Sequence, residues 1–303
     1  MFEEGQLYAP VTRRADGTVE VDLGATHPGV DDPVYRERRN TIAQLALSWQ
    51  PGDPVPHATY TAEEHEVWRL ACAELTVLHE SLACRAYRDG AVRLGLPKDH
   101  IPQLDEVTAA LEPLTGFRYV PAAGLVPLRQ FYGSLADGIF HSTQYIRHHS
   151  VPLYTPEPDV VHEVLGHGAC LADPRFAALY RSAGAAARRV GSDRALEFVS
   201  KVFWFSLEFG VLREDGSVRT YGAGLLSSYG EIQQIADADL RPLDIARMGV
   251  QTYDITHYQP LLFCADSFDQ VEDVVGGFFD EVDDDLVERL LLTSAGTSAG
   301  STR

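Results

Sequence analysis

The stretch Tyr154-Thr-Pro-Glu-Pro-Asp-Val-Val-His-Glu-Val-Leu-Gly-His167 decides the fold around it. Thr155 can cap a helix that has a proline in its first turn. We therefore predict a helix over 157–166 that carries His162 and Glu163. At one residue's offset, Glu163 should point about 100° away from His162.

The two histidines of this stretch are five residues apart. On a regular helix His162 and His167 would point about 140° away from each other and would not share a face. Gly166 permits the helix to end or loosen before His167. The two imidazoles can then converge on one ion.

The spacing also bears on the chemistry. Zinc proteases use HExxH, and the pattern here is one residue longer. Two histidines and a distant carboxylate form the facial triad that holds Fe(II) and leaves positions open for oxygen. Glu208 is the best candidate for the carboxylate, because it lies in the aromatic run 203–210 and a charge there is costly unless paired or metal-bound. From these residues alone, two structural histidines and a Glu208–arginine ion pair stay open.

Charge and composition exclude several other classes of protein. The 303 residues carry 25 Lys and Arg against 44 Asp and Glu, a net charge of −19 that disfavours nucleic acids and anionic membranes as partners. No apolar run reaches about 18 residues, and the first residues lack the pattern of a signal peptide. The four cysteines form no CxxC pair and are expected to be reduced thiols, so we predict a cytoplasmic protein.

The hydrophobic pattern predicts a single, mainly α-helical domain with a few short β-strands. We expect an N-terminal arm at 1–26 with a hairpin at Asp16-Gly17, a domain over 27–292 and a flexible tail at 293–303. The expected helices cover 31–49, a long segment from 61, 103–112, 127–139, 157–166, 173–190, 194–210, 224–238 and 269–292. The expected strands cover 117–120, 218–220 and 251–255.

Several runs, taken together, resemble the pterin-dependent aromatic amino acid hydroxylases, and the phenylalanine hydroxylases most of all. The runs are HPGVDDPVYR at 27–36, IPQL at 101–104, TGFR at 115–118, FHSTQYIRH at 140–148, LYTPEPD at 153–159, HEVLGH at 162–167, YGAGLLSSYGE at 221–231, QPL at 259–261 and DSF at 266–268. The resemblance spans residues 25 to 280.

The resemblance implies a monooxygenase that hydroxylates the ring of L-phenylalanine with O2 and a tetrahydropterin, such as tetrahydrobiopterin. It assigns an Fe(II) ion to His162, His167 and Glu208, in agreement with the triad above. Tyrosine is the expected product, with meta-tyrosine or hydroxylation of tryptophan as alternatives. From other classes, a zinc-dependent hydrolase that uses the His-Glu pair and a binding protein that has lost its chemistry are the competing hypotheses.

The same resemblance assigns the binding residues. Arg147 sits where the family binds the amino acid carboxylate, which suits a planar guanidinium that makes two charge-assisted bonds. The other expected substrate residues are Asp159, which orients Arg147, and Thr155, Trp204, Gly224, Ser227 and Cys264. The expected pterin residues are Gly124, Leu125, Val126, Phe131, Glu163 and Phe203, with Glu163 acting through water or the pterin and Phe203 standing in place of a frequent tyrosine.

Three positions depart from the family pattern. Ala169 and Cys170 stand where the family usually has Pro-Leu, and Cys264 is expected on a loop that separates members of different substrate preference. A changed pocket floor would favour attack at another ring carbon, although simple packing explains these residues equally well. The acidic cluster at 280–285 does not suit an oligomerisation helix, which needs an apolar face, so we expect a monomer.

Overall fold

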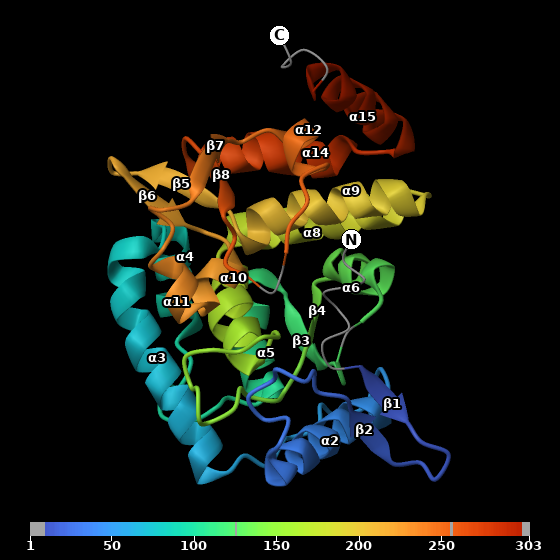
Figure 1. Ribbon diagram of the computed structural model, residues 1–303, viewed down its shortest axis with the longest axis vertical. Helices are drawn as coiled ribbons and strands as arrows, with labels where there is room; N and C mark the ends of the chain where they lie inside the picture. Colours follow the sequence, from blue (N-terminus) through green and yellow to red (C-terminus); the bar gives the residue numbers. More distant parts are fainter. Residues whose placement is uncertain (1–9, 125, 255–256, 299–303) are drawn as a thin grey trace.

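The chain begins with a small hairpin that leans on the first helix. The computed structural model describes residues 10–124, 126–254 and 257–298 (Figure 1). Strands β1 (Val11–Arg13) and β2 (Val19–Val21) pair antiparallel, and Gly17 in their turn has a φ of +86°, which glycine adopts without strain. Helix α2 (Pro33–Ser48) follows, with Asp32 accepting hydrogen bonds from the first helical N–H groups. The predicted hairpin and helix are both present.

Long helices form most of the core. Helix α3 (Ala62–Leu82) starts at the predicted capping box of Thr61 and Glu64. The other long helices are α4 (Arg85–Leu94), which we did not predict, α5 (Leu104–Thr115), α6 (Leu128–Leu135), α8 (Pro174–Arg189) and α9 (Asp193–Phe203). Helix α8 packs on α6 and α9 and buries eight of its residues, so it lies at the centre of the core.

Short strands close two sides of the helical core. The parallel pair is β3 (Arg118–Pro121) and β4 (Ile139–Ser142). A four-stranded sheet has the order β6 (Ser217–Thr220), β5 (Val211–Glu214), β8 (Leu261–Ala265) and β7 (Asp239–Pro242). The predicted strands near 117–120 and 218–220 are confirmed. The one at 251–255 is wrong, since Gln251–Asp254 forms no strand and residue 255 lies outside the described part of the chain.

In the described part of the chain, three helical segments have π geometry, and two of them carry the predicted metal ligands. They are η1 (Val161–Gly168), which runs on into α7 (Ala169–Leu171), η2 (Trp204–Glu208), which continues α9, and η3 (Val271–Gly276), which lies between α13 (Phe268–Gln270) and α14 (Gly277–Glu281). The helix predicted over 157–166 therefore begins later and ends later. The backbone N–H of His162 donates to Asp159 Oδ1 at 3.3 Å, while the Thr155 hydroxyl donates to the carbonyl of Glu157 at 2.8 Å instead of capping the helix.

The remaining segments are short helices and the C-terminal helix. The predicted helix 224–238 is broken into α10 (Ala223–Ser227) and α11 (Tyr229–Ile232), and α12 (Ile245–Met248) follows. Helix α15 (Asp284–Ser298) extends past residue 293, so the tail expected to begin there is helical to Ser298.

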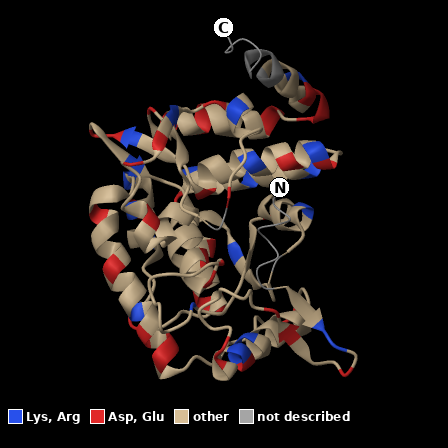
Figure 2. Ribbon diagram, in the orientation of Figure 1, with Lys and Arg blue, Asp and Glu red and all other residues tan. Residues whose placement is uncertain are grey.

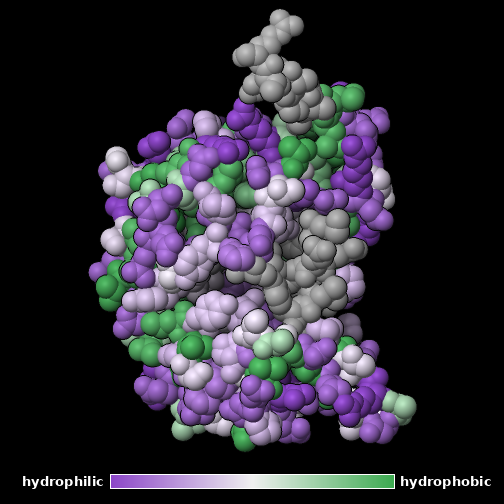
Figure 3. Space-filling model, in the orientation of Figure 1, coloured by the Kyte–Doolittle hydropathy of each residue, from purple (hydrophilic) through white to green (hydrophobic). Residues whose placement is uncertain are grey.

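Acidic and basic residues are spread over the elements in Figure 2, and hydrophilic residues cover most of the face in Figure 3. Within the described residues, none of the helices combines the length and the apolar character needed to cross a membrane.

Candidate functional site

The π geometry of η1 brings the two predicted histidines together. A π-helix forms i→i+5 hydrogen bonds, so residues five apart lie on the same face. His162 Nε2 and His167 Nε2 are 2.9 Å apart. Convergence is as predicted, but the helix does not end at Gly166. A Cβ at Gly166 would lie 2.8 Å from the carbonyl oxygen of Ala223, so glycine lets η1 pack closely on α10.

Glu208 completes this group from 41 positions further along the chain, at the end of η2. Its Oε1 lies 3.2 Å from His167 Nε2, and its Oε2 lies 3.7 Å from His162 Nε2. The three candidate metal ligands therefore point at a single position. We call these three residues the His-His-Glu centre.

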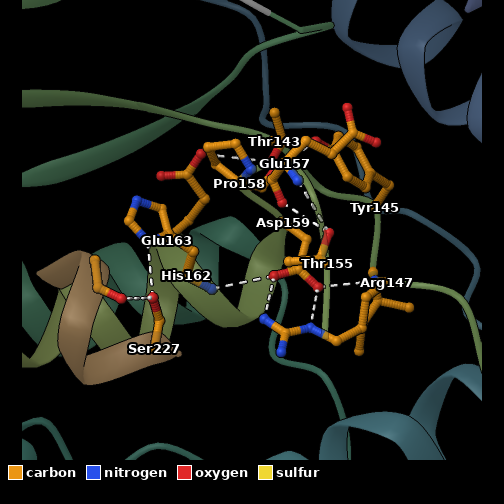
Figure 4. Close-up of polar contacts among 12 residues, drawn as sticks. Thr143, Tyr145, Arg147, Thr155, Glu157, Pro158, Asp159, His162, Glu163 and Ser227 are labelled. Carbon is orange, nitrogen blue, oxygen red and sulfur yellow. Dashed lines mark hydrogen bonds and ion pairs between the residues drawn. The ribbon is translucent and has the colours of Figure 1, made fainter. Parts of the chain in front are cut away.

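The opposite ring nitrogens of both histidines are held by hydroxyl groups. His162 Nδ1 lies 2.9 Å from the Ser227 hydroxyl, a contact drawn in Figure 4. Because Ser227 donates its only proton to the carbonyl of Ala223, His162 Nδ1 must be the donor, which leaves Nε2 with its lone pair. His167 Nδ1 lies 2.7 Å from the Tyr180 hydroxyl. Such outer contacts fix the ring orientation of metal-binding histidines.

The charge states of the centre suit a cation. Burial, together with the nearby His167, lowers the pKa of His162 to about 4. Burial on its own would raise the pKa of Glu208, but the charges of His167 and His162 and the hydrogen bonds from His167 and the Gly224 N–H outweigh it and lower this pKa. A neutral imidazole and an ionised carboxylate are the forms that coordinate metals.

Glu163 lies closer to the centre than the helical offset predicts. One ligand atom each from His162, Glu163 and His167 lie within 4.8 Å of one another, because the π turn rotates Glu163 toward the same cavity. The Thr143 hydroxyl donates to Glu163 Oε1 at 3.4 Å. Burial, and then the Glu208 charge, raise the pKa of Glu163 well above its ordinary value.

Arg147 and Asp159 form a buried ion pair beside the centre (Figure 4). Arg147 Nε and Nη2 donate to the two Asp159 oxygens at 2.9 and 2.8 Å, and the Arg147 backbone N–H donates at 2.8 Å. The two side chains are 2% and 0% exposed. Within the described part of the chain no side chain or carbonyl accepts from Arg147 Nη1, so that end of the guanidinium is available to a ligand.

A cavity of about 420 Å³ joins the centre to this ion pair. The predicted site residues that line it are Gly124, Val126, Phe131, Arg147, Thr155, His162, Glu163, His167, Phe203, Trp204, Glu208, Gly224 and Ser227. Asp159 lies behind Arg147 and does not line the cavity. Leu125 is outside the described residues.

The aromatic walls of the cavity are braced by further rings. Trp204 stacks on Tyr253 with ring centres 4.3 Å apart and lies 4.4 Å from the ring of Phe209. Phe203 packs edge-on against Tyr132 at 5.0 Å. Phe131 contacts Tyr132 at 5.4 Å while it faces the cavity. These contacts hold the walls in fixed orientations.

The three departures from the family pattern do not reach the cavity. Cys264 lies inside strand β8, not on a loop as expected, and packs in a small apolar cluster with Val211 and Leu225. Ala169 and Cys170 follow η1, are buried, and are absent from the lining residues. Any influence of these residues on the site must pass through packing.

Other lining residues were missed by the sequence reasoning. Arg39 and Tyr145 line the wall beside Glu157, whose carboxylate accepts from Arg39 and lies 3.3 Å from His27 Nε2. Glu231 also lines the cavity, and burial raises its pKa to about 7. The charged Glu157 between two prolines was a usable signal, but nothing in the sequence pairs it with residues more than 100 positions away.

The fold and this site define a class of enzyme. A sequence profile of the biopterin-dependent aromatic amino acid hydroxylases matches residues 13–289. The chain belongs to this family of pterin-dependent monooxygenases, and its mainly helical catalytic domain with short strands is as predicted.

Individual members of the family show which of its proteins this chain resembles. Phenylalanine 3-hydroxylase of Streptomyces coeruleorubidus is 50% identical over 91% of this chain and 98% of its own length. Phenylalanine-4-hydroxylase of Bos taurus is 42% identical over 85% of this chain, which spans 58% of that protein. Among solved structures, Chromobacterium violaceum phenylalanine hydroxylase with bound iron(III) and 7,8-dihydrobiopterin has a TM-score of 0.71 at 28% identity, covering 78% of this chain and 90% of that one.

Proposed function

We propose that this protein hydroxylates the aromatic ring of L-phenylalanine with O2 and a tetrahydropterin at a mononuclear Fe(II) site. The observation that carries the proposal is the His-His-Glu centre, which opens into the same cavity as the buried Arg147. An amino acid whose carboxylate contacts Arg147 can then extend its ring toward the centre.

The donor set of the centre fits iron. Two neutral imidazoles and one carboxylate form the ligand set of non-haem Fe(II) oxygenases. With His162 Nδ1 occupied by Ser227, its Nε2 is directed at the ion position, and Tyr180 orients His167 in the same way. Iron bound by His162, His167 and Glu208, together with the pterin, would supply the activation of O2 that ring hydroxylation requires.

The substrate end depends on charge and orientation. Arg147 would bind the carboxylate of the amino acid with its free Nη1 end, while Asp159 holds the guanidinium from the other side. Trp204 offers a braced aromatic face to the substrate ring. Thr155, Gly224 and Ser227 line the same cavity. Together these groups fix the substrate in one orientation, which is the main contribution a protein makes to such chemistry.

The pterin would bind on the opposite wall. Phe131 presents a ring for stacking, and Gly124 and Val126 bring backbone groups to the polar edge of the cofactor. Glu163 lines the same cavity beside His162 and His167, so it can contact the pterin or a water molecule. Phe203 has no hydroxyl and contributes only apolar contact.

Carbon 3 of the ring is the candidate position of attack. The Streptomyces relative named phenylalanine 3-hydroxylase is matched over nearly its whole length at 50% identity. Attack at carbon 4, which gives tyrosine and was our expectation from the sequence, is the second candidate, favoured by the 42% identity to a phenylalanine-4-hydroxylase.

Product analysis tests the proposal. Purified protein is loaded with Fe(II) and incubated with L-phenylalanine, tetrahydrobiopterin and air, and the products are separated by chromatography against meta- and para-tyrosine standards. We expect meta-tyrosine, with no turnover when pterin or iron is omitted. Para-tyrosine alone would reject attack at carbon 3 and retain the enzyme class. Turnover that needs zinc and ignores pterin would reject the whole proposal.

The monomeric state, the cytoplasmic location and the lack of nucleic-acid partners stay predictions from the sequence. Gel filtration with light scattering would test the first of these.

A further inference from the structure

A second group of metal-ligand side chains lies at the surface, away from the His-His-Glu centre. Within the described residues, two groups of His, Asp and Glu side chains bring ligand atoms within 4.8 Å of one another. One contains His162 and His167. The other consists of Asp32, His148 and His149. We infer that this second group binds a divalent transition-metal ion such as zinc, and we call it the surface cluster.

Three parts of the chain converge at the surface cluster. Asp32 precedes α2, and the two histidines follow β4. Asp32 Oδ2 lies 3.2 Å from His148 Nε2, and the two imidazole rings are 4.2 Å apart at a tilt of 33°. Glu63, in the first turn of α3, adds a fourth group, because its Oε2 lies 3.4 Å from His149 Nδ1.

The two inner ligands are already oriented by contacts on their far sides. The Ser150 backbone N–H donates to His148 Nδ1 at 3.3 Å, so without an ion the ring proton sits on Nε2, which lies 3.2 Å from Asp32 Oδ2. The Ser150 hydroxyl, 2.7 Å from Nδ1, can accept that proton when it moves to Nδ1 and an ion takes its place at Nε2. His148 Nε2 is thereby turned toward Asp32. The other Asp32 oxygen, Oδ1, accepts from the N–H groups of Val34 and Tyr35, so the carboxylate is fixed as well. This is the outer support that metal-binding histidines and carboxylates have in proteins.

The outer ligands have the freedom to close on an ion. The side chains of His149 and Glu63 are 40% and 64% exposed, whereas His148 is 7% exposed. Ligands about 2.0–2.1 Å from a zinc ion lie roughly 3.3–3.5 Å from each other, so His149 has to move on the order of 1 Å. Rotation of an exposed side chain supplies such a shift at little cost.

The donor chemistry selects the class of ion. Two imidazoles with one or two carboxylates suit zinc, cobalt or nickel, whereas calcium and magnesium prefer oxygen ligands alone. The two carboxylates bring negative charge to the site. Asp32 is paired with His148 and Glu63 with His149, so neither carboxylate is neutralised by a Lys or Arg partner among the described residues. A bound ion would tie the starts of α2 and α3 to the segment that follows Arg147.

Metal stoichiometry tests the inference. The full-length protein is dialysed against zinc chloride, and bound zinc is measured by mass spectrometry. We expect two zinc ions per chain for the parent protein and one for His149→Ala. The matched control is His100→Ala. This exposed histidine has its Nδ1 2.9 Å from Asp99 and belongs to no group of three converging ligand atoms within the described residues, so the variant should keep both ions.

Two further measurements separate a metal site from a change in folding. Ser150→Ala, which leaves all ligands in place, should weaken the second zinc by about 10- to 100-fold. In the absence of zinc, His149→Ala should retain the iron content and thermal melting temperature of the parent. When zinc is added, it should lose only the part of the temperature rise that the second ion contributes. Equal amounts of bound zinc in the parent protein and in His149→Ala would overturn the inference.

Discussion

The two ends of the catalytic cavity hold their charges in opposite ways. At the His-His-Glu centre, two imidazole nitrogens and a carboxylate face one another, and their outer contacts leave the inner atoms directed at one shared point. At the other end, Arg147 is already matched within the protein by Asp159. The facing ligand atoms of the first end need a cation between them. At the second end the Arg147 charge is already paired, and its Nη1 is available to a ligand. The comparison indicates that the metal end attracts a cation by its charge, whereas the arginine end holds a ligand mainly through the fixed orientation of the Arg147 guanidinium.

The largest effect is expected at the metal end. Glu208→Ala should remove the bound iron and lower turnover by about three orders of magnitude, the size of the several kcal/mol that a metal ion contributes to catalysis. Iron content and turnover are measured together. Glu197→Ala, which removes a carboxylate 2.9 Å from Lys201 on α9, serves as the control and should keep both. An iron-loaded, active Glu208→Ala protein would remove Glu208 from the ligand set.

The next effect concerns stability at the arginine end. Asp159→Ala should lower the free energy of unfolding by about 3–5 kcal/mol, because it leaves the Arg147 charge buried without its partner. Urea denaturation measures this change. In the control, Asp137→Ala removes an exposed partner of Arg188 and should lower the free energy of unfolding far less than Asp159→Ala does. Equal losses in the two variants would mean that the buried pair is no more important than a surface pair.

A milder change at the same end separates charge from geometry. Arg147→Lys keeps the positive charge but cannot bind Asp159 and a substrate carboxylate together with planar, paired bonds. We expect KM for phenylalanine to rise by about 10- to 100-fold, the value of one charge-assisted hydrogen bond, with kcat little changed. Steady-state kinetics give both constants. If KM does not change, the carboxylate is bound somewhere else.

The smallest effect belongs to a carboxyl group of the cavity wall that takes part in neither end. Burial raises the pKa of Glu231 from 4.5 to about 7, so between these values the folded chain binds a proton that the unfolded chain does not. Its contribution to stability therefore falls as the pH rises through this window. Glu231→Gln should be more stable than the parent by roughly 2 kcal/mol or less at pH 8, and the difference should vanish near pH 4.5. Urea denaturation at both pH values measures the free energy of unfolding of the two proteins. A stability difference that does not change with pH would contradict the raised pKa of Glu231.

Local sequence signals predicted much of the fold. The capping box of α3, the turn at Gly17 and the proline at the start of α2 all act within a few residues, and each element begins where they indicate. The helix break after Ser227 and the strand β8 were not predicted. Strand β8 is buried on both faces, and a short apolar run of that kind has no alternation to reveal it.

At the site, too, some features follow from local sequence spacing and others depend on the folded chain. The spacing of His162 and His167 was enough to predict convergence, but the reason given, a helix that ends at Gly166, was wrong because the helix continues with π geometry. Glu163 lines the cavity, as the family resemblance implied, although a regular helical offset alone does not predict it. The lining by Arg39, Tyr145 and Glu231 depends on segments that meet only in the folded chain.

The sequence by itself determined the ligand types, their order and the mainly helical domain, because those follow from residue chemistry and local periodicity. The tertiary structure decided that Glu208 meets the two histidines, that Asp159 matches Arg147, and that Cys264 lies inside a sheet instead of at the cavity. The physical reason is that hydrogen bonds, burial and charge pairing act over a few ångströms in space, while the residues that supply them are tens of positions apart in the chain.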